Sequence, residues 1–258
     1  MRAKRSLGQN FLVDRGVVSR ILDIAGVVPD ARILEIGPGR GALTSEAVAR
    51  SADCIALEKD DELAPALAAR FGENLRVIHD DALETALDGP DFADRVVIGN
   101  LPYNVAVPIL RRLLSVVPPF PRLVLMFQRE VAARLTATPG TKQYGIPSLM
   151  VRVSATARLA LAVPPEAFRP SPKIQSAVVV LEPLSIPLLP PEEREVFLNA
   201  AASWFRYRRK TIRNCLLQSG VAGPLADKAL IAADIPPTVR PETLPVEKLI
   251  KLWQGMLR

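Results

Sequence analysis

The fold is decided by residues 32–41, which read RILEIGPGRG. A strand pattern over Arg32–Ile36 ends directly in three glycines separated by single residues, and a helical pattern over Ala42–Arg50 follows. A buried strand that turns through closely spaced glycines into a helix is typical of the first β-α unit of an open α/β sheet. These residues therefore predict an α/β, Rossmann-like fold with a mostly parallel sheet.

Strand and helix patterns alternate on both sides of this stretch. Strands are expected at Cys54–Leu57, Leu75–Ile78, Arg95–Ile98 and Leu123–Phe127, and helices over 14–27, over Asp61–Phe71 and from about Val105. Farther along, Arg158–Val163 and Ala177–Leu181 are expected to pair around a proline-rich loop. Short apolar strands that alternate with helices favour a parallel sheet covered by helices on both faces.

A second domain is expected after a proline-rich linker near residues 183–191. Helical patterns follow it at about 191–203, 208–219, 222–233 and 241–257, with no strand pattern among them. We therefore predict an α/β domain over residues 1–185, which begins with a basic arm over 1–13, and a small all-helical domain over 186–258.

The composition excludes several classes of protein. The 258 residues are 49% hydrophobic and 23% charged, which is typical of a globular chain. No apolar run approaches the roughly 20 residues of a membrane helix, and the basic N-terminus does not continue into a secretory signal, so no membrane partner is expected. Two distant cysteines and a single histidine, His79, argue against disulfides and metal sites and favour a cytoplasmic protein.

Charge is distributed unevenly along the chain. Residues 1–100 carry 12 Lys and Arg against 17 Asp and Glu, whereas residues 101–258 carry 21 against 10. The net charge is therefore −5 in the first part and +11 in the second, out of +6 overall. This asymmetry predicts a polyanionic partner, such as a nucleic acid, for the later part of the chain.

The glycine turn favours a nucleoside cofactor that carries no phosphates. Gly37 and Gly39 belong to a G-x-G-x-G spacing rather than the G-x-G-x-x-G of dinucleotide folds, and Pro38 has no N–H to offer a phosphate. An NAD-dependent oxidoreductase is therefore disfavoured, and S-adenosyl-L-methionine is the expected cofactor. Glu58, at the end of the next strand, is placed to accept the ribose hydroxyls, and Asp81, after the third, to accept the adenine amine.

A candidate catalytic corner, Asn100-Leu101-Pro102-Tyr103, follows the fourth strand. The exocyclic amine of adenine is a poor nucleophile because its lone pair is delocalised into the ring. The Asn100 side-chain oxygen and the Leu101 carbonyl can accept its N–H groups, and Pro102 stiffens the turn that aims them. Tyr103 offers a flat face on which an extruded base can stack. The corner predicts methyl transfer to an adenine amine.

Several strings resemble those of the rRNA adenine N6,N6-dimethyltransferases. They are KRSLGQNFL at 4–12, EIGPGRG at 35–41, DAL at 81–83, NLPYN at 100–104, FQREV at 127–131, Tyr144-Gly145 and PEAFRPSPKIQS at 165–176. The resemblance implies that Asn10 and Leu12 close over the cofactor beside Gly37, Glu58, Asp81 and Asn100. It also implies that Phe168 stacks on the target adenine opposite Tyr103. A phenylalanine in a proline-rich loop is expected to form a rigid, exposed platform for this purpose.

The resemblance further implies a substrate. The bacterial branch of this family dimethylates two adjacent adenosines in a hairpin loop near the 3′ end of 16S rRNA, within the pre-30S particle, during ribosome biogenesis. Candidate phosphate contacts are Arg2, Lys4 and Arg5 in the arm and Arg206, Arg208, Arg209, Lys210 and Arg213 in the second domain, with Arg111, Arg112, Arg129 and Arg134 as additions. The protein is expected to be a monomer.

Two alternatives remain open besides the oxidoreductase. The first is a large-subunit (23S) rRNA adenine methyltransferase of the antibiotic-resistance type, which performs the same chemistry. The second is a non-catalytic RNA-binding assembly factor or transcription factor on the same fold.

Overall fold

The computed structural model describes residues 10–207 and 209–257, and these divide into two compact units. Unit 1 comprises Met1–Ala132 and Ala157–Pro183, and unit 2 comprises Ala133–Thr156 and Leu184–Arg258. We expected residues 133–156 in the α/β domain, but they cluster with the C-terminal helices. The reason lies in packing: the Tyr144 ring packs at a tilt against the Phe205 ring, with centroids 6.2 Å apart. Among the described residues, no helix has the length and apolar character that a membrane crossing needs.

Unit 1 is built on a sheet that confirms the predicted α/β class. Within residues 10–207 the strand order is β4-β3-β2-β5-β6-β9-β7. The bounds are β2 Arg32–Ile36, β3 Asp53–Glu58, β4 Arg76–His79, β5 Val96–Asn100, β6 Arg122–Gln128, β7 Ala155–Val163 and β9 Ser176–Pro183. Strands β4, β3, β2, β5 and β6 run parallel, whereas β9 pairs antiparallel with β6. The sheet is therefore mostly, but not wholly, parallel.

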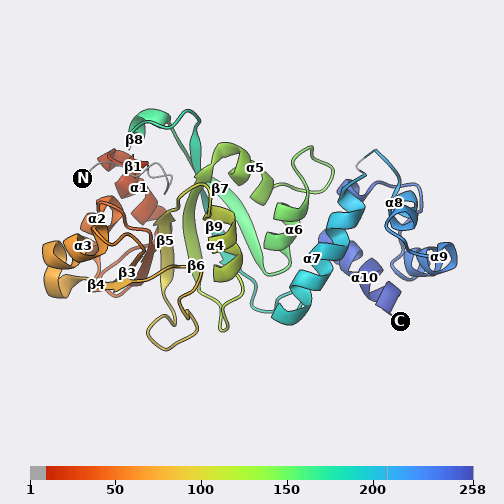
Figure 1. Cartoon of the computed structure of the whole chain (residues 1–258), viewed down its shortest axis with the longest axis horizontal. Coiled ribbons are helices and arrows are strands. Elements are labelled where there is room, and N and C mark those ends of the chain that lie inside the picture. Colours follow the sequence, from red (N-terminus) through yellow and green to blue (C-terminus); the bar gives the residue numbers. More distant parts are fainter. Residues whose placement is uncertain (1–9, 208, 258) are drawn as a thin grey trace. The chain divides into compact units, whose positions relative to one another are not determined.

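The helices of unit 1 follow the strands as the periodicity predicts. They are α1 Arg15–Ala25, α2 Ala42–Arg50, α3 Leu63–Phe71 and α4 Ala106–Leu113, with α2 and α3 beside β3 and β4 (Figure 1). Helix α1 begins where the Asp14 side chain accepts the Val17 N–H, and it ends at Gly26, whose φ of 73° is a left-handed cap. Its apolar face, which includes Ile21 and Leu22, joins the core against the sheet.

A small antiparallel pair was not expected from the sequence. Strand β1 (Phe11–Leu12) lies against β8 (Phe168–Arg169), with Phe11 opposite Arg169 and Leu12 opposite Phe168. The pair continues into a bond from the Val13 N–H to the Ala167 carbonyl, 2.8 Å long. It ties the start of the described chain to the proline-rich loop.

Among the described residues of unit 2, the regular structure is helical apart from the first residues of β7. Its helices are α6 Ile146–Arg152, α7 Pro191–Phe205, α8 Ile212–Gln218, α9 Gly223–Ala232 and α10 Val246–Leu257, while α5 Arg129–Leu135 joins the two units. Helix α7 starts with proline and two glutamates in its first turn, which suits a helix N-terminus. The Phe197 and Trp253 rings pack edge to face, with centroids 5.9 Å apart. The four C-terminal helical patterns are thus confirmed, whereas α5 and α6 were not predicted.

Candidate active site

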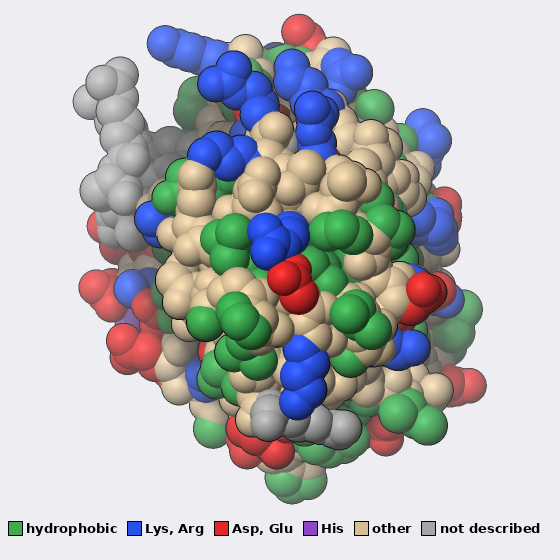
Figure 2. All heavy atoms as spheres, turned by 90° about the vertical axis from the view of Figure 1, so that its right-hand side faces the viewer, with side chains coloured by type: hydrophobic (Ala, Val, Ile, Leu, Met, Phe, Trp, Pro, Cys, Tyr) green, Lys and Arg blue, Asp and Glu red, His purple; other side chains and the backbone are tan. Residues whose placement is uncertain are grey.

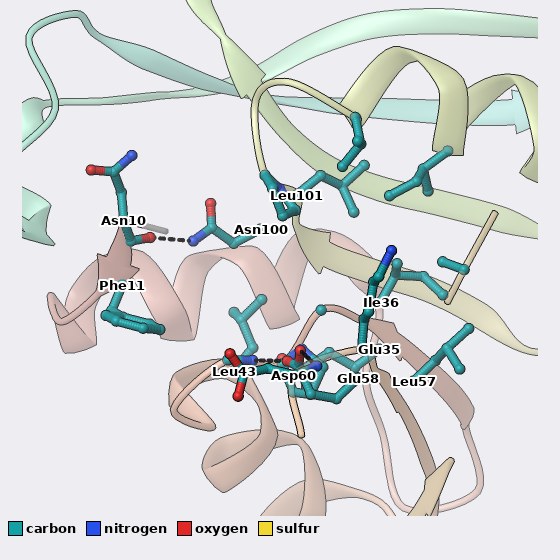
Figure 3. A pocket seen from close by; sticks show the side chains of 18 of the residues that line it. Asn10, Phe11, Glu35, Ile36, Leu43, Leu57, Glu58, Asp60, Asn100 and Leu101 are labelled. Atoms are coloured by element: carbon teal, nitrogen blue, oxygen red, sulfur yellow. Dashed lines mark hydrogen bonds between the residues drawn. The ribbon is translucent and has the colours of Figure 1, made fainter. Parts of the chain in front are cut away.

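A pocket opens where the parallel strands end. Its lining combines the residues that follow β2, β3, β4 and β5 with the beginning of the described chain. All the predicted cofactor residues line it, namely Asn10, Leu12, Gly37, Gly39, Glu58, Asp81 and Asn100, and so do Leu101, Pro102 and Tyr103 of the corner. In Figure 3, Asn100 and Leu101 lie on one side of the pocket, and Glu58 and Asp60 lie on another. The structure therefore brings the two predicted motifs together around one cavity.

The glycine turn has a backbone that only glycine adopts easily. Gly37 and Gly39 have φ angles of 65° and 59°. A Cβ on Gly39 would also lie 3.3 Å from the Phe11 ring. That ring carries the Arg40 guanidinium, 4.3 Å from its centroid. The turn therefore has no side chains at Gly37 and Gly39, and the Phe11 ring and the Arg40 guanidinium lie over it at Gly39.

Glu58 holds the glycine turn and keeps capacity for a ligand. One carboxylate oxygen accepts the Gly39 N–H at 2.9 Å, and the other accepts the Asp60 N–H at 2.9 Å. The residue is buried, yet it lines the pocket. Each carboxylate oxygen can accept more than one hydrogen bond, so both can still accept the hydroxyls of a ribose.

Asp81 lies across the pocket as an ionised acceptor. Burial alone would raise its pKa, but the Lys59 ammonium at 2.5 Å and the Leu83 N–H at 2.9 Å together hold that pKa below its usual value. Its backbone stands at the start of a turn in which the Thr85 hydroxyl binds the Asp81 carbonyl at 2.8 Å. An anionic oxygen at this place suits an exocyclic amine donor.

Glu35 is a pocket residue to which the sequence analysis gave no role. It is 3% exposed, and the Thr44 hydroxyl donates to its carboxyl at 2.6 Å. Burial raises the pKa of Glu35 to about 7, the Thr44 bond acts in the opposite direction, and the Glu58 charge adds to the rise. A lone acid within the apolar strand β2 was the signal that could have identified it.

The Asn100 amide is oriented by the beginning of the described chain. Its Nδ2 donates to the Asn10 carbonyl at 3.0 Å, and the amide oxygen points away from that bond (Figure 3). The preceding Gly99 passes so close to β2 that a Cβ would lie 2.8 Å from the Ile36 carbonyl oxygen. Leu101 is 1% exposed, which anchors the turn in the core. The Asn100 side chain is therefore held by the Asn10 carbonyl, and the backbone beside it is held by β2 and the core.

Tyr103 ends the corner with a half-buried ring. Its hydroxyl lies 2.7 Å from the Ser176 hydroxyl, and burial raises the pKa of the phenol. Ser176 is 1% exposed and was not singled out by the sequence analysis. The two residues are far apart in the chain, so no local pattern joins them.

The expectation of an exposed Phe168 is wrong. Its side chain is 0% exposed, and it belongs to the main core with Leu161, Val163 and Val178. The physical reason is the β1–β8 pair, which places Phe168 opposite Leu12 and leaves the ring facing apolar neighbours. The ring is a loop anchor in this structure, and it does not line the pocket.

The predicted phosphate contacts fall into three groups. Arg2, Lys4, Arg5 and Arg208 lie outside the described residues. Arg206, Arg209 and Lys210 are exposed beside α7, with the Lys210 ammonium 5.8 Å from the Tyr207 ring centroid. Arg213 instead forms a bidentate ion pair with Asp227, at 2.6 and 2.9 Å. Figure 2 shows Lys and Arg side chains gathered along the upper edge of the face in view.

Arg112 does not belong to a basic face. Its guanidinium donates to the backbone carbonyls of Glu84, at 3.2 Å, and Thr85. These carbonyls end the turn that carries Asp81. Arg129 is likewise engaged, because its guanidinium binds the Gln175 side chain at 2.8 Å. Both side chains are therefore engaged with neighbouring loops, and their contacts do not support the phosphate role expected for them.

The fold and the pocket define a class of protein. A mostly parallel sheet, a glycine turn with little capacity for phosphate, and acids at the ends of the next two strands are the features of a class I methyltransferase. The acceptors and the bare glycine backbone fit S-adenosylmethionine, which is the cofactor of this class. The sequence pattern of the ribosomal RNA adenine dimethylase family matches residues 1–251, and the chain belongs to that family.

Comparisons with known proteins agree over the whole chain. The ribosomal RNA small subunit methyltransferase A of Geobacter metallireducens is 41% identical over 265 residues, which cover 100% of this chain and 96% of that protein. The protein of the same name from Geobacillus thermodenitrificans is 39% identical, over 98% of this chain and 91% of its own. Among solved structures, the 23S rRNA methyltransferase ErmE has a TM-score of 0.72 and 25% identity, over 96% of this chain and 100% of that chain.

A second solved structure supports the fold alone. The dimethyladenosine transferase from Plasmodium falciparum has a TM-score of 0.78 at 23% identity, over 96% of this chain and 97% of that chain. Because the chain belongs to the ribosomal RNA adenine dimethylase family, it is an S-adenosylmethionine-dependent rRNA adenine methyltransferase.

Proposed function

We propose that this protein dimethylates the N6 amines of two adjacent adenosines in the hairpin loop near the 3′ end of 16S rRNA, in the pre-30S particle. The observation that carries the proposal is the Asn100–Tyr103 corner at the rim of the pocket that also holds the glycine turn. Acceptors for an amine and residues that can bind a nucleoside cofactor line the same cavity. The protein acts in the cytoplasm as a monomer.

The cofactor supplies a methyl group on a sulfonium, which is already electrophilic. The chain therefore needs no strong base before attack. In the first transfer, the Asn100 amide oxygen and the Leu101 carbonyl accept the two N–H groups of the amine, and in the second transfer one N–H remains for them. In both they favour a pyramidal nitrogen whose lone pair faces the pocket, and the nitrogen releases one proton to solvent after each transfer. Tyr103 stacks on the flipped base. Because the Asn10 carbonyl already holds the Asn100 amide, little reorganisation is needed at the moment of reaction.

Cofactor binding is assigned to the residues that line the pocket. Glu58 accepts the ribose hydroxyls, Asp81 accepts the adenine amine, and the glycine turn lets the ligand approach the backbone. Asn10 and Leu12 cover the ligand from the N-terminal side, as part of the arm over residues 1–13. The pocket must also admit an amine that already carries one methyl group, because the product is dimethylated.

RNA binding is assigned to two sets of cations. Exposed Arg206, Arg209 and Lys210 in unit 2 bind phosphates, together with Arg208. Arg2, Lys4 and Arg5 form the second set, in the arm. Unit 2 therefore serves as the RNA-binding part of the chain, in line with the positive charge of its sequence.

The small subunit is favoured over the large subunit by the comparisons. Relatives about 40% identical over the full chain carry small-subunit names, whereas the 23S rRNA enzyme ErmE is 25% identical. A non-catalytic role is disfavoured because the Asn100 corner is intact and open to the pocket.

The deciding experiment separates these possibilities. The protein is incubated with labelled cofactor and with small or large ribosomal subunits that lack the modification, and the nucleosides are analysed. We expect N6,N6-dimethyladenosine in small-subunit rRNA only, mapped by primer extension to adjacent positions. Label in large-subunit rRNA would favour the antibiotic-resistance type, and label in neither would favour a binding factor.

A further inference from the structure

Ser176 stands at the active edge of the sheet because β9 runs antiparallel to β6. It is the first residue of β9, and it pairs with Gln128 at the carboxyl end of β6. In the parallel part of the sheet, Asn100 ends β5 at the same edge. A residue at the beginning of an antiparallel strand therefore comes to lie beside the ends of the parallel ones.

The position of Ser176 is rigidly supported. The Arg129 N–H donates to the Gln175 carbonyl at 2.9 Å, and the Arg129 guanidinium holds the Gln175 side chain at 2.8 Å. From Ser176 onward, β9 is hydrogen-bonded along β6. The Ser176 side chain is thus carried by the sheet itself rather than by a mobile loop.

Within the part of the chain that the structure describes, the Ser176 hydroxyl has one side-chain partner, the Tyr103 phenol, at 2.7 Å. Ser176 is 1% exposed, so its hydroxyl depends on a protein partner. Tyr103 in turn lies on the turn between β5 and α4, and it lines the pocket. The bond therefore fastens the outer end of the ring to the sheet, while the proline turn fixes its inner end.

We propose that Ser176 is a positioning residue that holds the Tyr103 ring at the angle needed to stack on the target adenine. The inference rests on the proposed role of Tyr103. A tyrosine side chain has two free torsions, and a bond at the hydroxyl removes the rotation that would swing the ring out of place. Ser176 acts on the base only through this ring, so it contributes to the reacting geometry and not to RNA or cofactor affinity.

A double-mutant cycle tests the inference. Ser176→Ala, Tyr103→Phe and the double variant are compared in single-turnover methylation of small ribosomal subunits that lack the modification. Each single variant is expected to slow methyl transfer about tenfold, and the double variant no further, because both remove the same bond. The dissociation constants for the subunit and for S-adenosylmethionine should stay unchanged.

Ser51→Ala is the matched control, because Ser51 is also buried and bonds to the Ala31 carbonyl, away from the pocket. It should lower the melting temperature as Ser176→Ala does, without slowing methyl transfer. Full activity of Tyr103→Phe, or effects of the two single changes that multiply in the double variant, would overturn the inference. Asn100→Ala tests the proposed function separately: if it retains wild-type activity, the proposed function fails, whatever the cycle shows.

Discussion

Asn100 is the residue on which the proposed chemistry depends most directly. Its amide oxygen is aimed by a bond from its own Nδ2 to the Asn10 carbonyl. Asn100→Ala removes one of the two acceptors for the amine, and we expect the rate of methyl transfer to fall by about 10²–10³-fold, the usual cost of one preorganised polar group. Single-turnover assays measure the rate, and filter binding should show that RNA is still bound.

The control for this change is Asn74→Ala, which removes an exposed amide in the short helix Gly72–Asn74, before β4. It should leave the rate of methyl transfer at the wild-type value. A near-normal rate in Asn100→Ala itself would contradict the proposed mechanism.

Glu35 gives the stability of the protein a distinct pH dependence. Because its pKa is raised from 4.5 to about 7 in the folded chain, the native state binds the proton more tightly than the unfolded state. Stability contributed by protonated Glu35 is therefore present at low pH, decreases as the pH rises from about 4.5 to about 7, and is constant above. Glu35→Gln mimics the protonated form, so it should stabilise the protein above pH 7 by roughly 3 kcal/mol relative to wild type.

Urea unfolding at pH 5 and pH 8 measures this difference. Glu73→Gln, at an exposed site, serves as the control and should not change the pH dependence. Equal slopes of stability against pH in wild type and Glu35→Gln would show that Glu35 is ionised in the folded protein.

At the scale of elements, helix α4 links the catalytic corner to the cofactor loop. It begins just after Tyr103, and its Arg112 donates to the carbonyls of Glu84 and Thr85 behind Asp81. Arg112→Ala should loosen this turn and weaken S-adenosylmethionine binding about fivefold to tenfold, which is less than the full loss of a charged hydrogen bond because Arg112 acts on the ligand only through the turn. Isothermal titration calorimetry measures the change.

The sequence suggests Arg112 as an RNA contact, and the same variant distinguishes the two roles. The salt dependence of RNA binding should be unchanged in Arg112→Ala. Arg20→Ala, which removes an exposed guanidinium from α1, is the control and should affect neither measurement. A weaker dependence of RNA affinity on salt concentration in Arg112→Ala would instead support Arg112 as an RNA contact.

Element lengths explain which helices and strands the sequence predicted. Helices α1 and α10 and the core strands show clear apolar periodicity, and their predicted positions agree with the structure within a few residues. Helices α5 and α6 have seven residues each, about two turns, and were not predicted. Helix α8 is as short, but it lies within the longer helical pattern at 208–219. Strands β1 and β8 have two residues each and exist only because they pair with each other.

At the scale of the whole molecule, the basic segment around residues 206–210 is the part that should bind RNA. Replacing Arg206, Arg209 and Lys210 together by alanine should weaken RNA binding and reduce the salt slope by about one unit for each phosphate that is no longer neutralised. Binding measured across a salt series tests this. Arg213→Ala is a control built into the same segment, because Arg213 is already paired with Asp227.

The two outcomes of this series are distinct. A reduced slope in the triple variant and an unchanged slope in Arg213→Ala would agree with the ion pairing in the structure. An unchanged slope in the triple variant would remove the segment from the RNA interface.

The fold class could be predicted from the amino-acid sequence, and so could two segments that the structure brings to one pocket, the glycine turn and the Asn100–Tyr103 corner. These features depend on short local patterns, such as the glycine turn at 37–41 and the Asn100–Tyr103 corner. Residues that are adjacent in the chain set the backbone conformation of such patterns. The burial of Phe168, the ion pair of Arg213, the hydrogen bonds of Arg112 and the bond between Tyr103 and Ser176 became visible only in the folded chain. Each of these joins residues far apart in the chain or depends on the neighbours that packing supplies, and such contacts leave no periodic trace in the sequence.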